Sequence, residues 1–97
     1  MKVFMTYDVS IRQGEVKPAL LEEGFFDRWR VNNTLYYLPD TTLWHPNLES
    51  LQRAIDIFNT VIQQLNIGQP PANIIVIDRL MSVNFETSLG IPGKPHA

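Results

Sequence analysis

Apolar residues recur at spacings of three and four between residues 48 and 65, which places them all on one side of a helix. Asn47 stands in the N-cap position before this repeat, and Gly68 follows its last turn. A helix with one apolar side must bury that side against another element. The repeat therefore predicts a domain in which this helix lies across a small β-sheet.

Segments rich in β-branched and aromatic residues predict four strands for that sheet, at residues 2–9, 34–38, 42–45 and 73–80. The first segment carries large apolar residues on both of its alternating faces, so we expect it in the centre of the sheet. The second and third segments are separated by the turn residues Pro39 and Asp40, and they are expected to pair as a hairpin.

A shorter helix is expected over residues 15–23. Pro18 then falls in the first turn, where its missing N–H has no helical partner to lose. Gly24 is the expected end of this helix, because glycine readily adopts the left-handed conformation that closes one. The aromatic stretch over residues 25–33 is expected to be a connector.

The order strand, helix, strand, strand, helix, strand predicts an α+β fold, the ferredoxin-like βαββαβ sandwich. Right-handed crossovers place both helices on one face of an antiparallel sheet. A short extra strand is expected within residues 81–89, so residues 1–89 form one domain and residues 90–97 a flexible tail. The other sheet face would have no cover from its own chain, and an uncovered apolar face favours a homodimer.

The amino-acid composition excludes several classes of protein. The chain has 97 residues, 44% hydrophobic and 19% charged, as in an ordinary globular domain. It has no cysteine, which excludes disulfides and thiolate metal sites. No signal-peptide run or segment of ~20 apolar residues is present, so the expectation is a cytoplasmic protein without a membrane partner. The net charge of −2 argues against a dedicated nucleic-acid binder, although a dimer can still form a local basic groove.

Asp8 is the main candidate for chemistry, because it stands at the end of the first strand. Mg²⁺ takes oxygen ligands and uses only one or two carboxylates from a protein. Two symmetric Asp8 side chains facing each other in a dimer would supply them, and the ion would stabilise charge that develops on a phosphate. The alternative is that Asp8 accepts a backbone N–H and caps the turn that follows.

Five other residues are candidates for binding nucleic acid. Ser10 and Arg12 follow Asp8 and could hold a phosphate, or they could form a solvated loop. Arg28 and Arg30 flank Trp29, an arrangement in which a base stacks on the indole while the arginines bind phosphates. The alternative is that Trp29 belongs to the core and the arginines face water. The two histidines have no zinc-binding spacing.

The stretches FMTYDVSIR, LLEEGFF, TLYYLPDTTLW and NIIVIDRL, spread over residues 2–80, resemble a superfamily of small ferredoxin-like proteins. It holds the CRISPR-associated adaptation nucleases, the virulence-associated protein D toxins and the SinR-like proteins. The resemblance implies a homodimer and, in some members, metal-dependent cleavage of RNA or DNA by the strand-one aspartate, here Asp8. LPDTTLWHP is closer to the SinR-like branch, whose function the resemblance leaves open.

Two functions are therefore carried forward. One is a homodimeric, nucleic-acid-associated endonuclease of the CRISPR-adaptation or SinR-like type, with Mg²⁺ held by Asp8. The other is a non-catalytic dimeric module that binds a protein partner.

Overall fold

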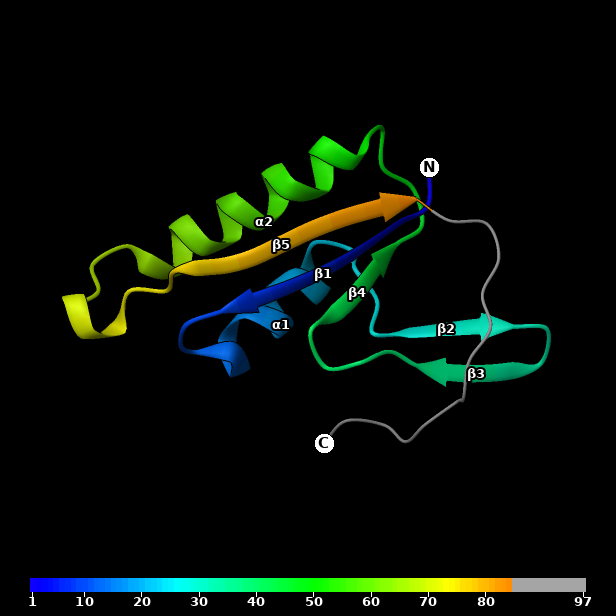
Figure 1. Ribbon diagram of the computed structural model, residues 1–97, viewed down its shortest axis with the longest axis horizontal. Helices are drawn as coiled ribbons and strands as arrows, with labels where there is room; N and C mark the ends of the chain where they lie inside the picture. The colour runs from blue at the N-terminus through cyan, green and yellow to red at the C-terminus, as the bar shows by residue number, and fades with distance from the viewer. Residues whose placement is uncertain (85–97) are drawn as a thin grey trace.

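The structure is a computed structural model that describes residues 1–84, and it shows an α+β fold with two helices and antiparallel strands (Figure 1). Strands β4, β1 and β5 form a three-stranded sheet in that order, and β2 and β3 form a separate two-stranded sheet. The elements are β1 (Val3–Val9), α1 (Gln13–Glu22), β2 (Arg28–Val31), β3 (Thr34–Tyr37), β4 (Thr42–His45), α2 (Leu51–Asn66), the 3₁₀ turn η1 (Pro71–Asn73) and β5 (Ile77–Asn84).

Strand β1 is central, as the sequence predicted, because β4 and β5 both pair with it in antiparallel register. Its side chains alternate between the two faces of the sheet. One face is buried and carries Val3, Met5, Tyr7 and Val9. Phe4, Thr6 and Asp8 lie on the opposite face, which we call the outer face.

The hydrophobic core lies between the buried face of the sheet and the two helices. Val16 and Leu20 of α1 are fully buried in it, and α2 contributes a longer row that includes Ala54 and Phe58. Tyr7 of β1 packs on Phe58, with ring centroids 5.0 Å apart. Both helices therefore cover the same face, which confirms the predicted layering.

Helix α1 begins two residues earlier than predicted. Arg12 takes a left-handed conformation at φ 60° and ends the turn after β1, so the helix starts at Gln13. Pro18 consequently lies in the second turn rather than the first. In the second turn, its missing N–H removes one helical hydrogen bond. Gly24, at φ +94°, follows the end of the helix as predicted, and its amide donates to the carbonyl of Leu21 at 3.1 Å.

Helix α2 begins three residues later than predicted. Ser50, not Asn47, is the N-cap residue, and its Oγ accepts the amide of Arg53 at 3.0 Å. Leu48 is buried but precedes the helix. Its amide donates to the carbonyl of Met1 at 3.0 Å, which holds this segment against the N-terminus. The apolar repeat in the sequence therefore extends past the true start of the helix. Neither α1 nor α2 is long and apolar enough to cross a membrane, within the part of the chain that is described.

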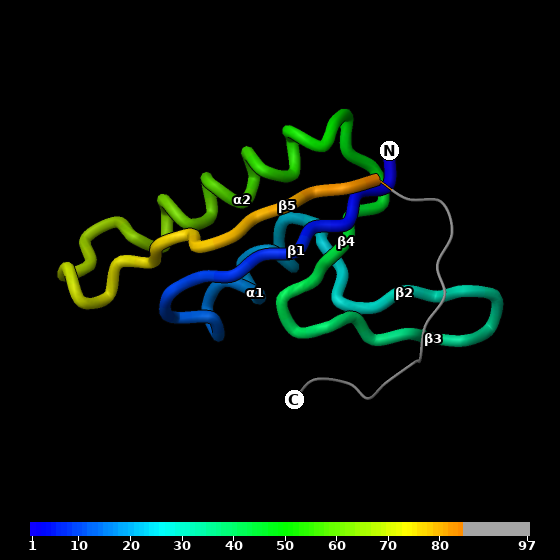
Figure 2. Tube along the Cα trace, viewed as in Figure 1, coloured from blue at the N-terminus to red at the C-terminus, as the bar shows by residue number. Residues whose placement is uncertain are grey.

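The hairpin forms from different strands than predicted. Residues 25–33 were expected to be a connector, yet β2 lies within them and pairs with β3 through the turn at Asn32 and Asn33. Asn32 adopts φ 55°, which suits a two-residue hairpin turn. The predicted pairing of residues 34–38 with 42–45 is therefore wrong, because β4 pairs with β1 instead. Figure 2 shows the β2–β3 hairpin extending away from the three-stranded sheet.

Strand β5 is displaced toward the C-terminus relative to the prediction of residues 73–80. Residue 73 belongs to η1, and β5 pairs with β1 from Val9↔Ile77 to Val3↔Asn84. Residues 81–84 thus continue β5 rather than begin a separate strand. The rest of the expected extra strand, at residues 85–89, and the expected tail at residues 90–97 lie outside the described residues.

Candidate site on the outer face of the sheet

The outer face of the sheet brings together residues from all three strands. Phe4 pairs with Trp44 of β4 and Val83 of β5, so these three side chains leave the sheet on the same side. The same register places Thr42 and Met81 beside Thr6, and Arg79 beside Asp8. The face is therefore apolar over most of its length and charged at the end where β1 stops.

The apolar part of this face is exposed in the single chain. Met81 is 60% exposed and Val83 is 44% exposed. With Phe4, Thr6 and Thr42 they line a shallow depression of about 180 Å³. Met81 and Val83 are two residues apart on β5, so their side chains project from the same face. Two large apolar side chains exposed next to each other favour contact with another surface.

An aromatic cluster lies at the β4 side of the outer face. The Trp29 ring meets the Trp44 ring edge-on at 4.3 Å between centroids, and it meets Phe4 at 5.4 Å. Phe26 also packs on Trp44, with ring centroids 5.4 Å apart, and their backbones form an isolated β-bridge. The Trp44 indole N–H donates to the carbonyl of Arg28. The hairpin is thus anchored to the outer face through Trp29.

This packing describes where Trp29 lies relative to the two arginines that flank it in the sequence. Its ring is partly buried against the outer face, outside the hydrophobic core cluster, and the ammonium of Lys2 lies 5.2 Å from its centroid. Arg28 and Arg30, two residues apart on β2, are exposed on the opposite side of the strand. The arginines and the indole therefore do not share one surface.

Asp8 lies on the outer face with its side chain 54% exposed. Arg79 stands directly opposite on β5, and its Nη1 lies 3.6 Å from Asp8 Oδ2. Both residues line a broad hollow of about 720 Å³ together with Thr6, Thr41 and Met81. Asp8 has the strand position and the face that the metal hypothesis requires. Within residues 1–84, Arg79 is the cation that lies beside it.

The alternative role for Asp8, capping the following turn, is filled by other residues. Ser10 closes that turn: its amide donates to the carbonyl of Val76 at 3.0 Å, and its Oγ accepts the Val76 amide at 2.9 Å. The Gln13 side-chain amide donates to the carbonyl of Val9 at 3.2 Å. These bonds hold the end of β1 against the segment that leads into β5. The backbone amide and the hydroxyl of Ser10 are both engaged in them.

Arg12 is also used inside the fold. Its guanidinium is bonded to both carboxylate oxygens of Glu15, at 2.6 and 2.9 Å. Its Nη1 donates to the carbonyls of Leu65 at 3.0 Å and Asn73 at 3.1 Å. The side chain is only 13% exposed. Arg12 therefore ties the end of α2 and η1 to the start of α1, and a phosphate would have to displace these partners.

The histidine at the end of β4 is a structural residue. The ring of His45 packs edge-on against Phe25, with centroids 5.2 Å apart, and its Nδ1 accepts the amide of Asn47 at 3.1 Å. Burial lowers the pKa of His45, partly offset by its hydrogen bond to the backbone of Glu23. His96 lies outside the described residues. Among residues 1–84, no three His, Cys, Asp or Glu side chains are grouped so as to hold a metal ion.

A further pocket, on the other side of β1, was not anticipated from the sequence. Tyr7, Lys17, Asp27 and Asp40 meet there, although they are far apart in the sequence. Asp40 was recognised only as a turn residue, and Lys17 lies in a helix with a weak apolar repeat. No local sequence pattern signals that these groups meet, because the contact depends on how the hairpin returns to β4.

Comparison with protein-family models, with curated proteins and with solved structures finds no match to this chain.

Proposed function

We propose that this chain acts as a homodimer whose outer faces meet, and that the two Asp8 carboxylates hold a divalent cation that acts on RNA or DNA. The observation that carries the proposal is the position of Asp8. It is exposed on the same face as Met81 and Val83, at the end of the central strand. A contact made through that apolar face brings two copies of Asp8 toward one another across a two-fold axis.

The dimer is supported by the imbalance between the two faces of the sheet. Two helices cover the inner face, whereas the outer face leaves apolar side chains of β5 in water. A stable interface removes on the order of 800 Å² from each partner. The exposed row of β5, together with Phe4 and Phe26, offers the apolar centre of such an interface.

Two carboxylates that face each other repel unless a positive charge lies between them. This repulsion supports a bound cation at the two Asp8 side chains. One Asp8 per chain is a weak site, so binding requires the dimer. Arg79 competes for the same carboxylate, yet both groups are exposed and such pairs are weak. A bound Mg²⁺ would polarise a phosphodiester and stabilise the charge that develops on it.

The finer fold assignment belongs to the same proposal. We infer a ferredoxin-like βαββαβ arrangement in which the bridge between Phe26 and Trp44 stands in for the remaining edge strand. The order would then be β5, β1, β4 and the Phe26 segment, with β2 and β3 as an extended hairpin. This arrangement supports the resemblance to the superfamily of small CRISPR-associated and SinR-like proteins.

A cleavage assay tests the proposal. Purified protein is incubated with single- and double-stranded RNA and DNA, with Mg²⁺, Mn²⁺ or EDTA. The wild type is expected to cleave one of these substrates only with metal, and Asp8→Asn to abolish cleavage. Asp78→Asn is the matched control, because Asp78 is an exposed carboxylate one residue from Arg79. Equal cleavage by wild type and Asp8→Asn, or none by either, would reject the nuclease function.

The pairing of Asp8 with Arg79 favours a second candidate, a non-catalytic dimeric module that binds a protein. In this case the two residues form an ordinary cross-strand pair at the rim of the interface. The net charge of −2 suits this function better than nucleic-acid binding. A dimer that neither cleaves nor binds RNA or DNA would favour it.

A further inference from the structure

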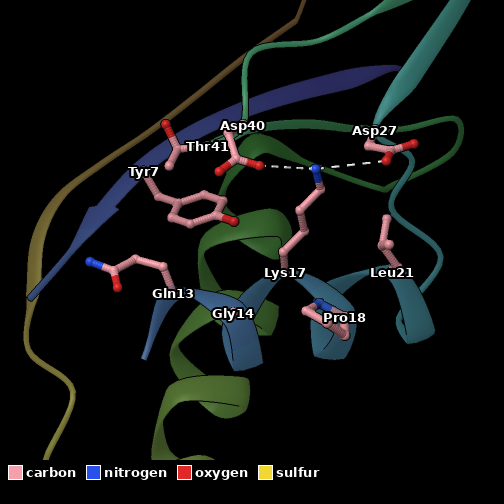
Figure 3. A pocket seen from close by; sticks show the side chains of 9 residues that line it. All are labelled: Tyr7, Gln13, Gly14, Lys17, Pro18, Leu21, Asp27, Asp40 and Thr41. Carbon is pink, nitrogen blue, oxygen red and sulfur yellow. Dashed lines mark hydrogen bonds and ion pairs between the residues drawn. The ribbon is translucent and has the colours of Figure 1, made fainter. Parts of the chain in front are cut away.

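A pocket of about 350 Å³ lies between α1 and the loop that leads into β4. It exists because β4 begins at Thr42, whereas β1 continues to Val9, so the edge of β1 has no strand beside it there. Figure 3 shows the side chains that line it: Tyr7, Gln13, Gly14, Lys17, Pro18, Leu21, Asp27, Asp40 and Thr41.

Tyr7 is the unusual member of this lining. The residue is only 4% exposed, and its ring packs in the core on Phe58. The hydroxyl points into the pocket (Figure 3) and makes no hydrogen bond to any residue from 1 to 84. A phenylalanine would fill the same core space without that polar group. No side-chain oxygen or nitrogen that is fully buried within residues 1–84 lacks a partner, so the Tyr7 hydroxyl reaches the open space of the pocket. It is therefore available to a ligand there.

Burial raises the pKa of Tyr7 to about 12, with a smaller contribution from the negative charge of Asp40. The phenol therefore keeps its proton at neutral pH. It faces the pocket as a hydrogen-bond donor that also has acceptor lone pairs.

Three charged groups form the rim beside this hydroxyl. Lys17 Nζ lies 3.3 Å from Asp40 Oδ1 and 3.7 Å from Asp27 Oδ2 (Figure 3). Asp27 is 16% exposed and also accepts a hydrogen bond from Arg28 Nε at 2.9 Å. Asp40 is 71% exposed, and Lys17 is its one cation partner among residues 1–84. Asp27 thus holds Lys17 in place, while Asp40 remains open to solvent.

The three rim groups carry one positive and two negative charges. Arg28, which lies outside the lining, pairs with Asp27 and offsets the remaining negative charge. A neutral ligand fits such a site better than a phosphate or a metal ion. It should carry N–H donors for the Asp40 carboxylate next to an acceptor for Lys17 and Tyr7. The side chains of Pro18 and Leu21 add apolar surface against which a flat ring can lie.

We propose that this pocket binds a nucleobase and selects guanine. The Asp40 carboxylate accepts the ring N1–H and the 2-amino group, while Lys17 and the Tyr7 hydroxyl donate to the neighbouring carbonyl oxygen. Adenine and cytosine offer Asp40 an amino group but no adjacent ring N–H, and uracil places carbonyls on both sides of its single N–H. The volume is at the lower end of the ~300–1,000 Å³ of small-molecule pockets, which suits one base.

This proposal goes beyond the proposed nuclease function, because it requires neither the dimer nor Asp8. The base could belong to a free nucleotide or to a single strand. Isothermal titration with GMP, AMP, CMP and UMP addresses the first source. Titration with a short oligo-uridine RNA carrying one guanine, and with the same RNA lacking it, addresses the second.

GMP or the guanine-containing RNA is expected to bind, with weak or undetectable binding of the other probes. Asp40→Asn should weaken binding at least about tenfold, because it loses one of two paired acceptors. Tyr7→Phe should also weaken binding and leave the melting temperature unchanged or higher, which a purely structural tyrosine would not do. Asp56→Asn, on the exposed side of α2, is the matched control and should bind as the wild type does.

Binding of the RNA alone would assign the strand as the source, and binding of GMP alone would assign the free nucleotide. Equal affinity for all four bases, no binding of any probe, or full binding by a folded Asp40→Asn would overturn the proposal. A loss of metal-dependent cleavage in Asp8→Asn has no bearing on these titrations, so the two proposals fail independently.

Discussion

Arg79 lies directly opposite Asp8 on neighbouring antiparallel strands, and its Nη1 is 3.6 Å from the Asp8 Oδ2. Both side chains are more than half exposed. The pair therefore marks Asp8 as a carboxylate on an open surface that already has one positive neighbour. Any cation that binds Asp8 must compete with this guanidinium.

Removing the competitor should strengthen the proposed metal site. Arg79→Ala is expected to increase the rise in melting temperature that Mn²⁺ causes, because stabilisation by a ligand grows with its affinity. Without metal the substitution should cost at most about 1 kcal/mol, since the pair is exposed. Differential scanning fluorimetry with and without Mn²⁺ measures both effects. Asp8→Asn should show no metal response, and a response that survives in Asp8→Asn would place the metal elsewhere.

The proposed dimer can be disrupted at Met81. Met81→Lys puts a charge in the centre of the exposed apolar row and should shift the protein from dimer to monomer at tens of micromolar. Ile67→Lys is the control, because Ile67 is 75% exposed and lies at the end of α2, away from the outer face. Sedimentation velocity measures the change. A wild type that sediments as a monomer would refute the dimer.

Arg30 offers a test of nucleic-acid association. It is exposed on β2 and, within residues 1–84, has no carboxylate partner to lose. If the hairpin contacts a phosphate through it, Arg30→Ala should weaken RNA or DNA binding uniformly across sequences. The slope of log affinity against log salt should fall by about 1. Fluorescence anisotropy at several salt concentrations measures this, with Arg53→Ala on α2 as the control. An unchanged slope would remove Arg30 from the interface.

The sequence predicts some of these features well. The period-two pattern of residues 2–9 identifies the central strand and the face that carries Asp8, because alternation alone assigns each side chain to a side. The repeat over residues 48–65 identifies the covering helix for the same reason. Where the pattern extends beyond an element, as at Leu48, the error is one of boundaries. Leu48 is buried without being helical, and periodicity does not distinguish the two states.

Pairing between strands could not be predicted in the same way. Both Pro39–Asp40 and Asn32–Asn33 are credible turns, and the choice between them depends on whether β4 gains more by joining β1 or β3. The meeting of Lys17 with Asp40 follows from that choice and from the return path of the hairpin. These contacts arise from tertiary packing, for which local residue preferences carry no signal.

The internal bonds of Arg12 predict a structural role for this residue. Arg12→Ala removes the donors to the Leu65 and Asn73 carbonyls and should lower the urea midpoint. Arg12→Lys should restore little, because a single ammonium does not reproduce the forked contact with Glu15. Arg53→Ala, which breaks only an exposed pair with Glu49 at 3.5 Å, is the matched control and should have a small effect. A midpoint unchanged by Arg12→Ala would leave this side chain available to a phosphate.

His45 should make the stability of the fold depend on pH. Burial lowers its pKa below the ordinary value of 6.5, so the native state favours the neutral ring. As the pH falls, His45 therefore takes up a proton in the unfolded chain before it does so in the native protein. The free energy of unfolding is highest above pH 6.5 as far as this group is concerned, and it decreases below pH 6.5. Protonation also removes the Nδ1 lone pair that accepts the Asn47 amide. Urea midpoints at pH 7.5, 6.5 and 5.5 should therefore decrease in order for the wild type. In His45→Gln the midpoint should change less over this range, whereas an equal decrease in both proteins would assign the pH dependence to other groups.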